Sequence, residues 1–562
     1  MTQRPLNPTK KTGILLVLLI SFLLNFIGIW FGLPGRTGWA PDEILPSDVQ
    51  EGIHRGFSHG WFKEYPPLHY YLLALVETPF MVYAKLRGLA LDSLSLTSLL
   101  FLAHRLLSLM MAAGIVLLVY KCGQEILDEK SALFSALIAA LLVPLVYYSK
   151  TANLDVPYLI WYMGSLLFFL RLRKTRKRRY YILFALSAVL AICAKDQAYG
   201  LYVLPTLIIL LADWKLRKRD NPKLTIIRFL SDRTYIYAAA VALGAFFLIY
   251  NFALNPQEFL QHIKVLARES QQWRLVSPTL SGHLYLLGRA VSQIRFSLGW
   301  PLFLVCLAGV IRSLVCKPRN MLLLSLFAFP VSYEALFVHV ILRNYSRFYL
   351  PLLLILSLYG GQFLSFVLQS RPKFSGLIRA TVLTIFAYSF FYASSLDIFM
   401  IKDARYAAEK WIRQNIPKEA RIGYAVPRDY GPRVEGYKSI LLVPPDWGKF
   451  QRLSSKPDFI ILNTDYRGRF RPESPAGQFF RNFPTGKEAY RVAYRYQTPL
   501  FWLPLKHREV MRQINTINPE IVIYKKLSVS LPQASPFKKP AQQGIKKTVG
   551  VGGAVARFLP SS

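Results

Sequence analysis

Eleven apolar blocks follow one another through the first 400 residues of this chain, separated by short polar segments. A helix needs roughly 20 mostly apolar residues to cross a hydrocarbon layer of about 30 Å. The pattern therefore predicts eleven membrane-spanning helices, at residues 13–33, 101–120, 132–148, 156–170, 181–194, 198–212, 235–250, 294–315, 322–341, 349–368 and 377–398.

One further apolar stretch, Pro66–Tyr83, is ambiguous, because it opens with two prolines and carries His69 and Glu77. The neighbouring loops decide how to interpret it. Short cytoplasmic loops collect Lys and Arg, and the run Arg171–Arg179 holds seven cations and no anion. If Pro66–Tyr83 crossed the membrane, this run would lie outside. We therefore expect Pro66–Tyr83 to be an interfacial or re-entrant helix on the outer face.

The same orientation places three other basic loops inside, at residues 215–219, 317–319 and 371–373. It predicts a cytoplasmic N-terminus. Two outer loops follow from it, residues 34–98, which include the juxtamembrane helix 66–83, and residues 251–293.

The chain after the last apolar block has a different pattern. Residues 404–413 have helical periodicity, and short strand-like runs separated by Pro, Gly and Asp follow them. These runs lie at 421–426, 439–443, 458–462 and 520–524. We predict a membrane domain at 1–399, an extracytoplasmic α/β domain at 400–526 and a disordered tail at 527–562, since the tail is rich in Pro, Gln, Lys and Gly.

Composition supports this division. Of 562 residues, 53% are hydrophobic and only 18% charged, which excludes an ordinary cytosolic enzyme. A formal charge of +38 alone would suggest nucleic acid or an anionic membrane as partner. Much of this charge lies in the predicted cytoplasmic loops, where it sets orientation and meets lipid headgroups. We expect no nucleic-acid partner, and no spacing of Cys and His suggests zinc.

Asp42 and Glu43 are the first candidates for chemistry. They follow the first span at the outer membrane surface, and Pro41 and Pro46 restrict the backbone around them. Adjacent carboxylates suit a general base whose neighbour raises its pKa, or a divalent cation site. The alternative is a solvated turn in which acidic residues favour a helix dipole.

Further candidates lie on the same predicted face. Asp155 precedes one span, Lys195 lies in an outer turn, and Arg347 stands at the outer end of the tenth span. The alternatives are that Asn153 or Asp155 caps this span and that Arg347 binds phospholipid headgroups. Their convergence favours a site in which carboxylates act on an acceptor hydroxyl or amine and cations hold a phosphate leaving group. This chemistry suits group transfer from a membrane-borne phosphate donor.

This ordered set resembles the polyprenyl-phosphate-sugar-dependent glycosyltransferases of the GT-C fold, the branch with the protein O-mannosyltransferases and the aminoarabinose transferase of lipid A. The likeness covers about residues 10–400. Its matching elements are Pro41-Asp42-Glu43, Tyr65-Pro66-Pro67-Leu68-His69-Tyr70-Tyr71, Arg105, Asn153-Leu154-Asp155, Ala194-Lys195-Asp196 and Arg347-Phe348-Tyr349-Leu350-Pro351.

The resemblance implies an α-helical polytopic membrane protein of GT-C type, with about eleven transmembrane helices and a C-terminal soluble α/β domain. It implies an inverting sugar transfer with Asp42 as base and Asp155 as second catalytic acid, and it places Lys195 and Arg347 near the donor phosphate. The other residues it implies in substrate or donor binding are Glu43, Lys63, Glu64, Tyr65, His69 and Tyr349.

The pattern also leaves some points open. Tyr65 stands where the aminoarabinose transferase pattern has a lysine, and Lys63 is the expected replacement. Glu43 and Glu64 are candidates for a divalent-ion or acceptor site, with no cofactor certain. The expected partners are a polyprenyl-phosphate-linked sugar, a lipid, protein or polysaccharide acceptor, and membrane lipids. We expect a multi-pass protein of a bacterial-type inner membrane that works on the extracytoplasmic face.

Two other functions compete with this interpretation. A secondary transporter or lipid flippase would have acids near the bilayer midplane and inverted repeats, whereas here the acids cluster at outer span ends and no internal repeat is evident. A membrane-anchored binding protein would not need eleven spans. The discriminating feature is geometry, because an enzyme requires Asp42, Asp155, Lys195 and Arg347 to line one outward-facing cavity.

The topology makes a direct prediction at Gly88. A reporter fused at this position should be extracytoplasmic, because helix 66–83 does not cross the membrane. If a reporter that is active only in the cytoplasm shows activity when fused at Gly88, the topology is wrong. A fusion within Arg171–Arg179 serves as the cytoplasmic control.

Overall fold

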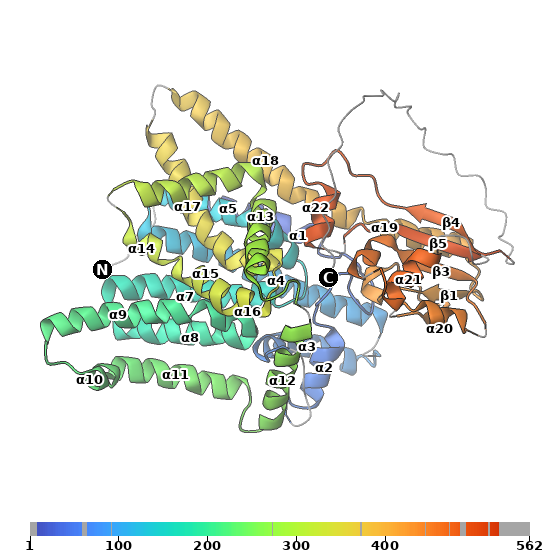
Figure 1. Ribbon diagram of the computed structural model, residues 1–562, viewed down its shortest axis with the longest axis horizontal. Coiled ribbons are helices and arrows are strands. Elements are labelled where there is room, and N and C mark those ends of the chain that lie inside the picture. Colours follow the sequence, from blue (N-terminus) through green and yellow to red (C-terminus); the bar gives the residue numbers. More distant parts are fainter. Residues whose placement is uncertain are drawn as a thin grey trace.

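The computed structural model describes residues 8–58, 65–90, 93–272, 274–317, 319–370, 374–443, 445–453, 455–470, 472–483, 490–514 and 517–527. These residues form a long helical bundle with a small α/β domain at one end (Figure 1). The predicted tail, apart from Leu527, lies outside the described residues.

All eleven predicted spans are largely helical. The elements that form them are α1 (Pro8–Phe26), α4 (Leu94–Ile126), α5 (Glu129–Ala140), α6 (Val143–Tyr148), α7 (Asp155–Thr175), α8 (Arg178–Ala194), η1 (Asp196–Leu201), α9 (Val203–Asp220), α11 (Arg233–Ile249), α13 (Leu280–Val315), α14 (Met321–Ser325), α15 (Ala328–Tyr333), η2 (Glu334–Val338), α16 (His339–Ile341), η3 (Ser346–Tyr349), α17 (Leu350–Ser370) and α18 (Ser375–Ile401). The predicted fold class, a polytopic helical membrane protein with a C-terminal α/β domain, is confirmed.

Some spans differ in detail from the apolar blocks. Six described helical stretches are long and apolar enough to cross a membrane by themselves, and residues 12–26 and 233–249 form shorter apolar helices. The first span ends as a helix at Phe26, and Gly28 and Gly32 beyond it have positive φ angles. The third is divided into α5 and α6, the second of which has a proline in its first turn. The eighth is a kinked helix, with Gly299 at a φ of 67° just before Pro301.

The bundle is packed around α7, which contacts both α4 and α8, while α17 packs against α5 and α13. The side chains of Tyr158, Tyr162 and Phe169 on α7 are fully buried. In contrast, α11 has no buried residue, and its Leu248 is 81% exposed. Such an apolar outward face is costly in water and is accommodated by lipid hydrocarbon.

A buried ion pair connects three segments of the bundle. Lys150, between α6 and α7, is fully buried and pairs with Asp397 of α18. The same ammonium donates to the backbone carbonyls of Leu24 and Ile27 at 2.6 Å and 2.9 Å. A buried charge is tolerated only when it is paired and hydrogen-bonded, so these contacts hold α18 against the end of α1.

The outer segments form their own helices. They are α2 (Pro46–His54), α3 (Leu68–Leu86) and α12 (Pro256–Gln272), and a short α10 (Ile226–Leu230) follows α9. The predicted helix 66–83 corresponds to α3, which packs against α2, α4 and α8. The side chains of Glu77 on α3 and His104 on α4 are both fully buried, and Glu77 Oε1 lies 2.6 Å from His104 Nε2. In Figure 1, α10 lies at the end of the bundle opposite the C-terminal domain, close in sequence to the basic run 215–219.

The C-terminal domain is a five-stranded sheet with helices on both faces. Its elements are α19 (Ala404–Asn415), β1 (Arg421–Tyr424), η5 (Arg428–Tyr430), β2 (Lys438–Leu441), α20 (Trp447–Gln451), β3 (Phe459–Asn463), η6 (Thr464–Arg469), α21 (Pro475–Asn482), β4 (Tyr490–Tyr496), α22 (His507–Gln513) and β5 (Ile521–Lys526). The strand order is β2-β1-β3-β5-β4.

The sheet combines parallel and antiparallel strand pairs, and four of its five strands were predicted from the sequence. β1 is parallel to β2 and β3, whereas β5 is antiparallel to β3 and β4. The four predicted strand-like runs correspond to β1, β2, β3 and β5. β4 was not predicted, because it is rich in arginine and tyrosine and lacks the aliphatic run that marks β2, the strand at the other edge of the sheet.

Candidate active site

Glu43 attaches the first outer segment to the bundle. Its carboxylate accepts two hydrogen bonds from the Arg105 guanidinium of α4, both at 2.9 Å, and a third from the backbone N–H of Ala152 at 2.9 Å. Arg105 also donates to the carbonyls of Ile29 and Phe31 at 2.7 Å and 2.8 Å. Both charged side chains are almost fully buried. This two-pronged pairing is strong and directional, so it fixes the residue next to Asp42.

The four residues expected to converge do so. Arg347, in η3, donates to Asp42 at 2.8 Å, and the same nitrogen lies 3.5 Å from Asp155 at the start of α7. The other oxygen of Asp155 accepts from Lys195 at 2.6 Å. The result is a chain of alternating charges, Asp42–Arg347–Asp155–Lys195, which we call the charge array.

The array becomes more exposed toward Asp42. The side chain of Asp155 is 1% exposed and that of Lys195 12%, whereas the side chain of Asp42 is 43% exposed. Asp42 also has a φ of 63°, which is uncommon outside glycine but tolerated by aspartate. The carboxylate that is most accessible therefore stands at a constrained position of the backbone.

The charge of Arg347 governs the ionisation of Asp42. Burial alone would raise the pKa of this carboxyl, but the Arg347 guanidinium, helped by Lys195 and Arg343, holds the pKa below its ordinary value. An opposite charge at this distance favours the ionised form. Asp42 is thus a carboxylate at neutral and mildly acidic pH, as a proton acceptor must be.

Two cavities border the charge array. The first, the acidic cavity, has a volume of about 540 Å³, and its wall includes Asp42, Glu43, Asp48, Tyr65, Tyr70 and Asp429. The second, the apolar cavity, has a volume of about 430 Å³, and its wall includes Tyr65, Lys195, Arg343, Arg347, Ile263, Leu266, Phe337, Val340, Ile341 and Phe348. Asp42 lies in the first wall and its partner Arg347 in the second, with Tyr65 in both.

The remaining predicted residues lie in different places. Tyr65 lines both cavities. His69 is fully buried in α3 and is not part of the described wall of either cavity. Tyr349 is buried too, and its hydroxyl accepts from Asn344 at 3.0 Å. Lys63 and Glu64 lie outside the described residues.

Sequence reasoning missed Asp429, which reaches the acidic cavity from the C-terminal domain. No pattern in the sequence indicates it, because its place depends on how the domain docks. Asp196 was noted only as the neighbour of Lys195. It accepts from the Tyr250 hydroxyl at 2.9 Å and lies 3.1 Å from the His262 ring nitrogen, which joins η1 to α12.

A metal site was one expected use of Glu43. Both oxygens of this carboxylate accept hydrogen bonds from Arg105 or Ala152, so they do not fit the role of a cation ligand. Within the described ranges, no group of three or more His, Cys, Asp or Glu side chains is arranged to hold a metal ion. A cofactor is thus not established.

Comparison with known families bears on this geometry. The sequence model of the dolichyl-phosphate-mannose-protein mannosyltransferase family matches residues 93–231. This segment contains Arg105 of α4, Asp155 of α7 and Lys195, which directly follows α8. The resemblance to polyprenyl-phosphate-sugar glycosyltransferases is confirmed. The predicted enzyme class and the multi-pass membrane location agree with it.

Similarity to solved structures is at low sequence identity. The chain is similar to ArnT from Cupriavidus metallidurans in the apo state, at 14% identity and a TM-score of 0.49, over 92% of this chain and 99% of that one. It is also similar to the oligosaccharyltransferase of Archaeoglobus fulgidus tethered with an acceptor peptide, at 12% identity and a TM-score of 0.47, over 87% of this chain and 73% of that one. A comparison with curated proteins yields no match.

The Glu43–Arg105 pair predicts a large stability effect. Glu43→Gln removes one charge of a buried pair, so it should lower the free energy of unfolding by about 3–5 kcal/mol. The control is Glu51→Gln, because Glu51 pairs with Arg55 at a site where both are over 40% exposed, and this change should cost less than about 1 kcal/mol. Thermal unfolding in detergent, followed by tryptophan fluorescence, compares the two. Equal small shifts would contradict the assigned role of Glu43.

Proposed function

We propose that the protein transfers a sugar from a polyprenyl-phosphate donor to an acceptor of the cell envelope, with inversion at the anomeric carbon. The observation that carries this proposal is the Asp42–Arg347 ion pair, which joins an acidic cavity to a cavity with cationic and apolar walls. The confirmed family resemblance supports the same donor class.

The apolar cavity suits the donor. Lys195, Arg343 and Arg347 provide positive charge at one part of its wall, and residues such as Val340 and Ile341 provide apolar surface at another. A polyprenyl phosphate has the same two parts, an anionic head and a hydrocarbon chain. When the bond between sugar and phosphate oxygen breaks, negative charge develops on the phosphate, and fixed cations stabilise that charge most in the transition state.

The acidic cavity suits the acceptor. In this mechanism an acceptor hydroxyl or amine in the cavity loses its proton to Asp42 as it attacks the anomeric carbon, and the polyprenyl phosphate departs on the opposite side. Asp155 pairs with both Lys195 and Arg347, so it holds the two cations toward the phosphate. The charge of the phosphate is met by these side chains, and the mechanism assigns no step to a metal ion.

Donor binding also adjusts Asp42. A phosphate beside Arg347 competes with Asp42 for the guanidinium, which is the main group that lowers the pKa of this carboxyl. The basicity of Asp42 therefore increases when the donor is in place. This coupling makes proton abstraction by Asp42 depend on a filled donor cavity.

We further propose that the site faces the extracytoplasmic side of a bacterial-type inner membrane, with the N-terminus in the cytoplasm and the C-terminal domain outside. The basic runs at 171–179 and 215–219 support this orientation. The acceptor is a lipid, a protein or a polysaccharide. A flippase, the second candidate, would use the same lipid-phosphate cavity but would form no glycosidic bond.

Replacement of Asp42 tests the proposal. Asp42→Asn should reduce transfer by about 10²–10⁴-fold, the usual contribution of a general base, and should leave polyprenyl phosphate binding intact. The control is Asp48→Asn, because Asp48 lines the same cavity, whereas the carboxylates that pair with Arg347 are those of Asp42 and Asp155. It should retain most of the activity.

The assay is the incorporation of labelled sugar from a polyprenyl-phosphate-linked pool into membrane vesicles of cells that lack the protein. Purified protein in detergent has no second compartment, so transfer under these conditions also separates an enzyme from a flippase. Full transfer by Asp42→Asn would remove Asp42 from the role of base. Lipid movement without transfer in the wild-type protein would support the flippase.

A further inference from the structure

Trp39, three residues before Asp42, is enclosed by the C-terminal domain. Its side chain is fully buried. The guanidinium of Arg405 lies 4.3 Å from the centre of its ring and that of Arg433 lies 5.0 Å from it. The ring of Tyr406 packs against it as well, with centroids 4.6 Å apart. Cations over an indole face are attracted by its quadrupole, most strongly where water is excluded. The C-terminal domain therefore holds the segment that carries Asp42.

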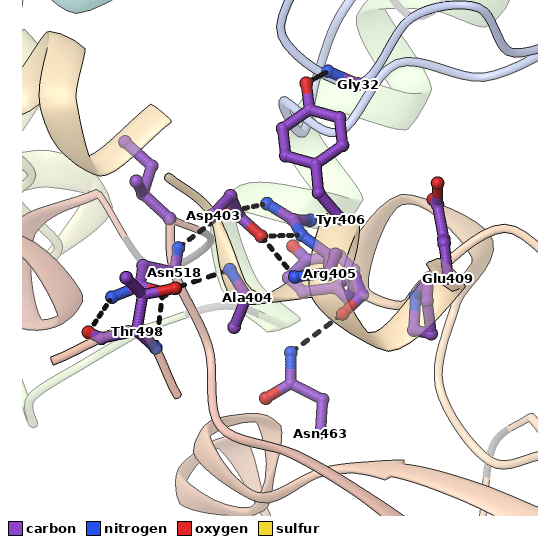
Figure 2. A network of polar contacts seen from close by, with 12 residues as sticks. Gly32, Asp403, Ala404, Arg405, Tyr406, Glu409, Asn463, Thr498 and Asn518 are labelled. Atoms are coloured by element: carbon purple, nitrogen blue, oxygen red, sulfur yellow. Dashed lines mark hydrogen bonds and ion pairs between the residues drawn. The ribbon is translucent and has the colours of Figure 1, made fainter. Parts of the chain in front are cut away.

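Backbone contacts reinforce this hold. Figure 2 shows the Tyr406 side chain reaching from α19 to Gly32, whose N–H donates to its hydroxyl at 3.0 Å. Arg433 donates to the carbonyls of Gly32 and Pro34. Gly32 has a φ of +73°, and a Cβ atom there would lie 2.8 Å from Trp39. Only glycine allows the chain to pass this closely beneath the indole ring.

Within the domain, the residues that contact Trp39 are themselves fixed. Arg405 is fully buried and donates twice to Asp403, at 2.8 Å and 2.9 Å. Asp403 also accepts from the backbone N–H of Asn518, just before β5, at 2.6 Å (Figure 2). Arg433 donates twice to Glu409 of α19, both at 2.6 Å. Movement of these arginines would require rearrangement of the domain, so the position of Trp39 is tied to the domain as a whole.

Arg405 also connects the C-terminal domain to the acidic cavity. Arg405 donates to the backbone carbonyl of Asp429 at 2.8 Å, and Asp429 lies in the cavity wall together with Asp42. The described wall of the apolar cavity, in contrast, contains no residue of the C-terminal domain. The domain thus borders the side of the site that we assign to the acceptor.

We propose that the C-terminal domain is a working part of the acceptor site, where it positions the Asp42 segment through Trp39 and forms one wall of the acceptor cavity. Arg405, Tyr406 and Arg433 are positioning residues in this account. The proposal rests on the function proposed for Asp42. It implies that loosening the domain contact impairs acceptor use and leaves donor binding unchanged, because the donor cavity is built by the membrane helices and outer loops.

Two matched pairs of variants test the proposal. Tyr406→Phe removes the hydroxyl that accepts from Gly32, and Tyr437→Phe removes a hydroxyl that donates to Ile412 inside the domain at 3.2 Å. Arg433→Lys weakens the contacts with the Asp42 segment. Its control is Arg413→Lys, because Arg413 pairs with the same Glu409, at 4.0 Å, from a side chain that is 63% exposed.

Four quantities, measured on the full-length protein in detergent, distinguish the variants. Hydrogen exchange of residues 32–45 should become faster in Tyr406→Phe and Arg433→Lys, and should not change in the two controls. Transfer to acceptor vesicles should fall by about tenfold or more in the same two variants, since a displacement of about 1 Å at a reacting group costs up to about a hundredfold. The amount of vesicles that half-saturates transfer should rise, and the affinity for polyprenyl phosphate should stay within about twofold of wild type.

Each other outcome contradicts part of the account. Unchanged exchange in both variants would show that the domain does not hold the Asp42 segment. Faster exchange with unchanged transfer would show that it holds the segment without serving the acceptor site. Equal losses of donor affinity and transfer would indicate a general structural defect. Transfer retained by Asp42→Asn would instead overturn the proposed function, while the exchange data would still report on the domain contact.

Discussion

Arg347 is shared between two carboxylates, and the organisation of the site depends on this sharing. Its nitrogen lies 2.8 Å from Asp42 and 3.5 Å from Asp155. Asp155 is almost fully buried and also pairs with Lys195, so the inner part of the array is neutralised before any ligand binds. Asp42, at the exposed end, keeps an accessible carboxylate whose pKa is set by Arg347. An incoming phosphate is therefore able to reorganise the array at Arg347 without leaving a charge unpaired in the low-dielectric interior.

Several ion pairs around the array hold its members in place, and they come from segments distant in sequence. Glu43 and Arg105 attach the Asp42 segment to α4, and Lys150 and Asp397 join the α6–α7 connection to α18. The Asp403–Arg405 pair fixes the C-terminal domain beside Trp39. Each pair is buried and hydrogen-bonded, which is the condition under which charges are retained away from water. The apolar cavity, which we assign to the donor, is thus lined by the helical bundle and its loops, and the acidic cavity, which we assign to the acceptor, includes Asp429 of the C-terminal domain in its wall.

The sequence could predict the helices and the charged residues of the site for physical reasons. Apolar blocks long enough to cross a bilayer are unambiguous, and ionisable residues at the outer ends of spans are costly enough to be informative. Asp42, Asp155, Lys195 and Arg347 were all predicted to lie at such ends, and the structure brings them together. The helix breaks at α5–α6 and within residues 321–341 depend on local prolines and packing, which an apolar pattern does not resolve.

The contribution of the C-terminal domain could not be predicted. In the sequence, Trp39 is one of several aromatic residues in a predicted loop, and Asp429 is one of several acidic residues in a predicted soluble domain. Their roles follow only from the docking of Arg405 and Arg433 on the Trp39 ring, a long-range contact without a local signature. β4 was missed for a different reason, since its arginine and tyrosine side chains do not form the aliphatic run that marks a buried strand such as β3.

The most direct test of the account is an experimental structure of the protein with polyprenyl phosphate bound. We expect the phosphate within hydrogen-bond distance of Lys195 and Arg347, and the hydrocarbon chain against Val340 and Ile341 in the apolar cavity. We also expect the distance between the Asp42 carboxylate and the Arg347 guanidinium to be longer than 2.8 Å. A phosphate bound instead in the acidic cavity beside Asp48 and Asp429, with Arg347 still on Asp42, would contradict the assignment of donor and acceptor sides.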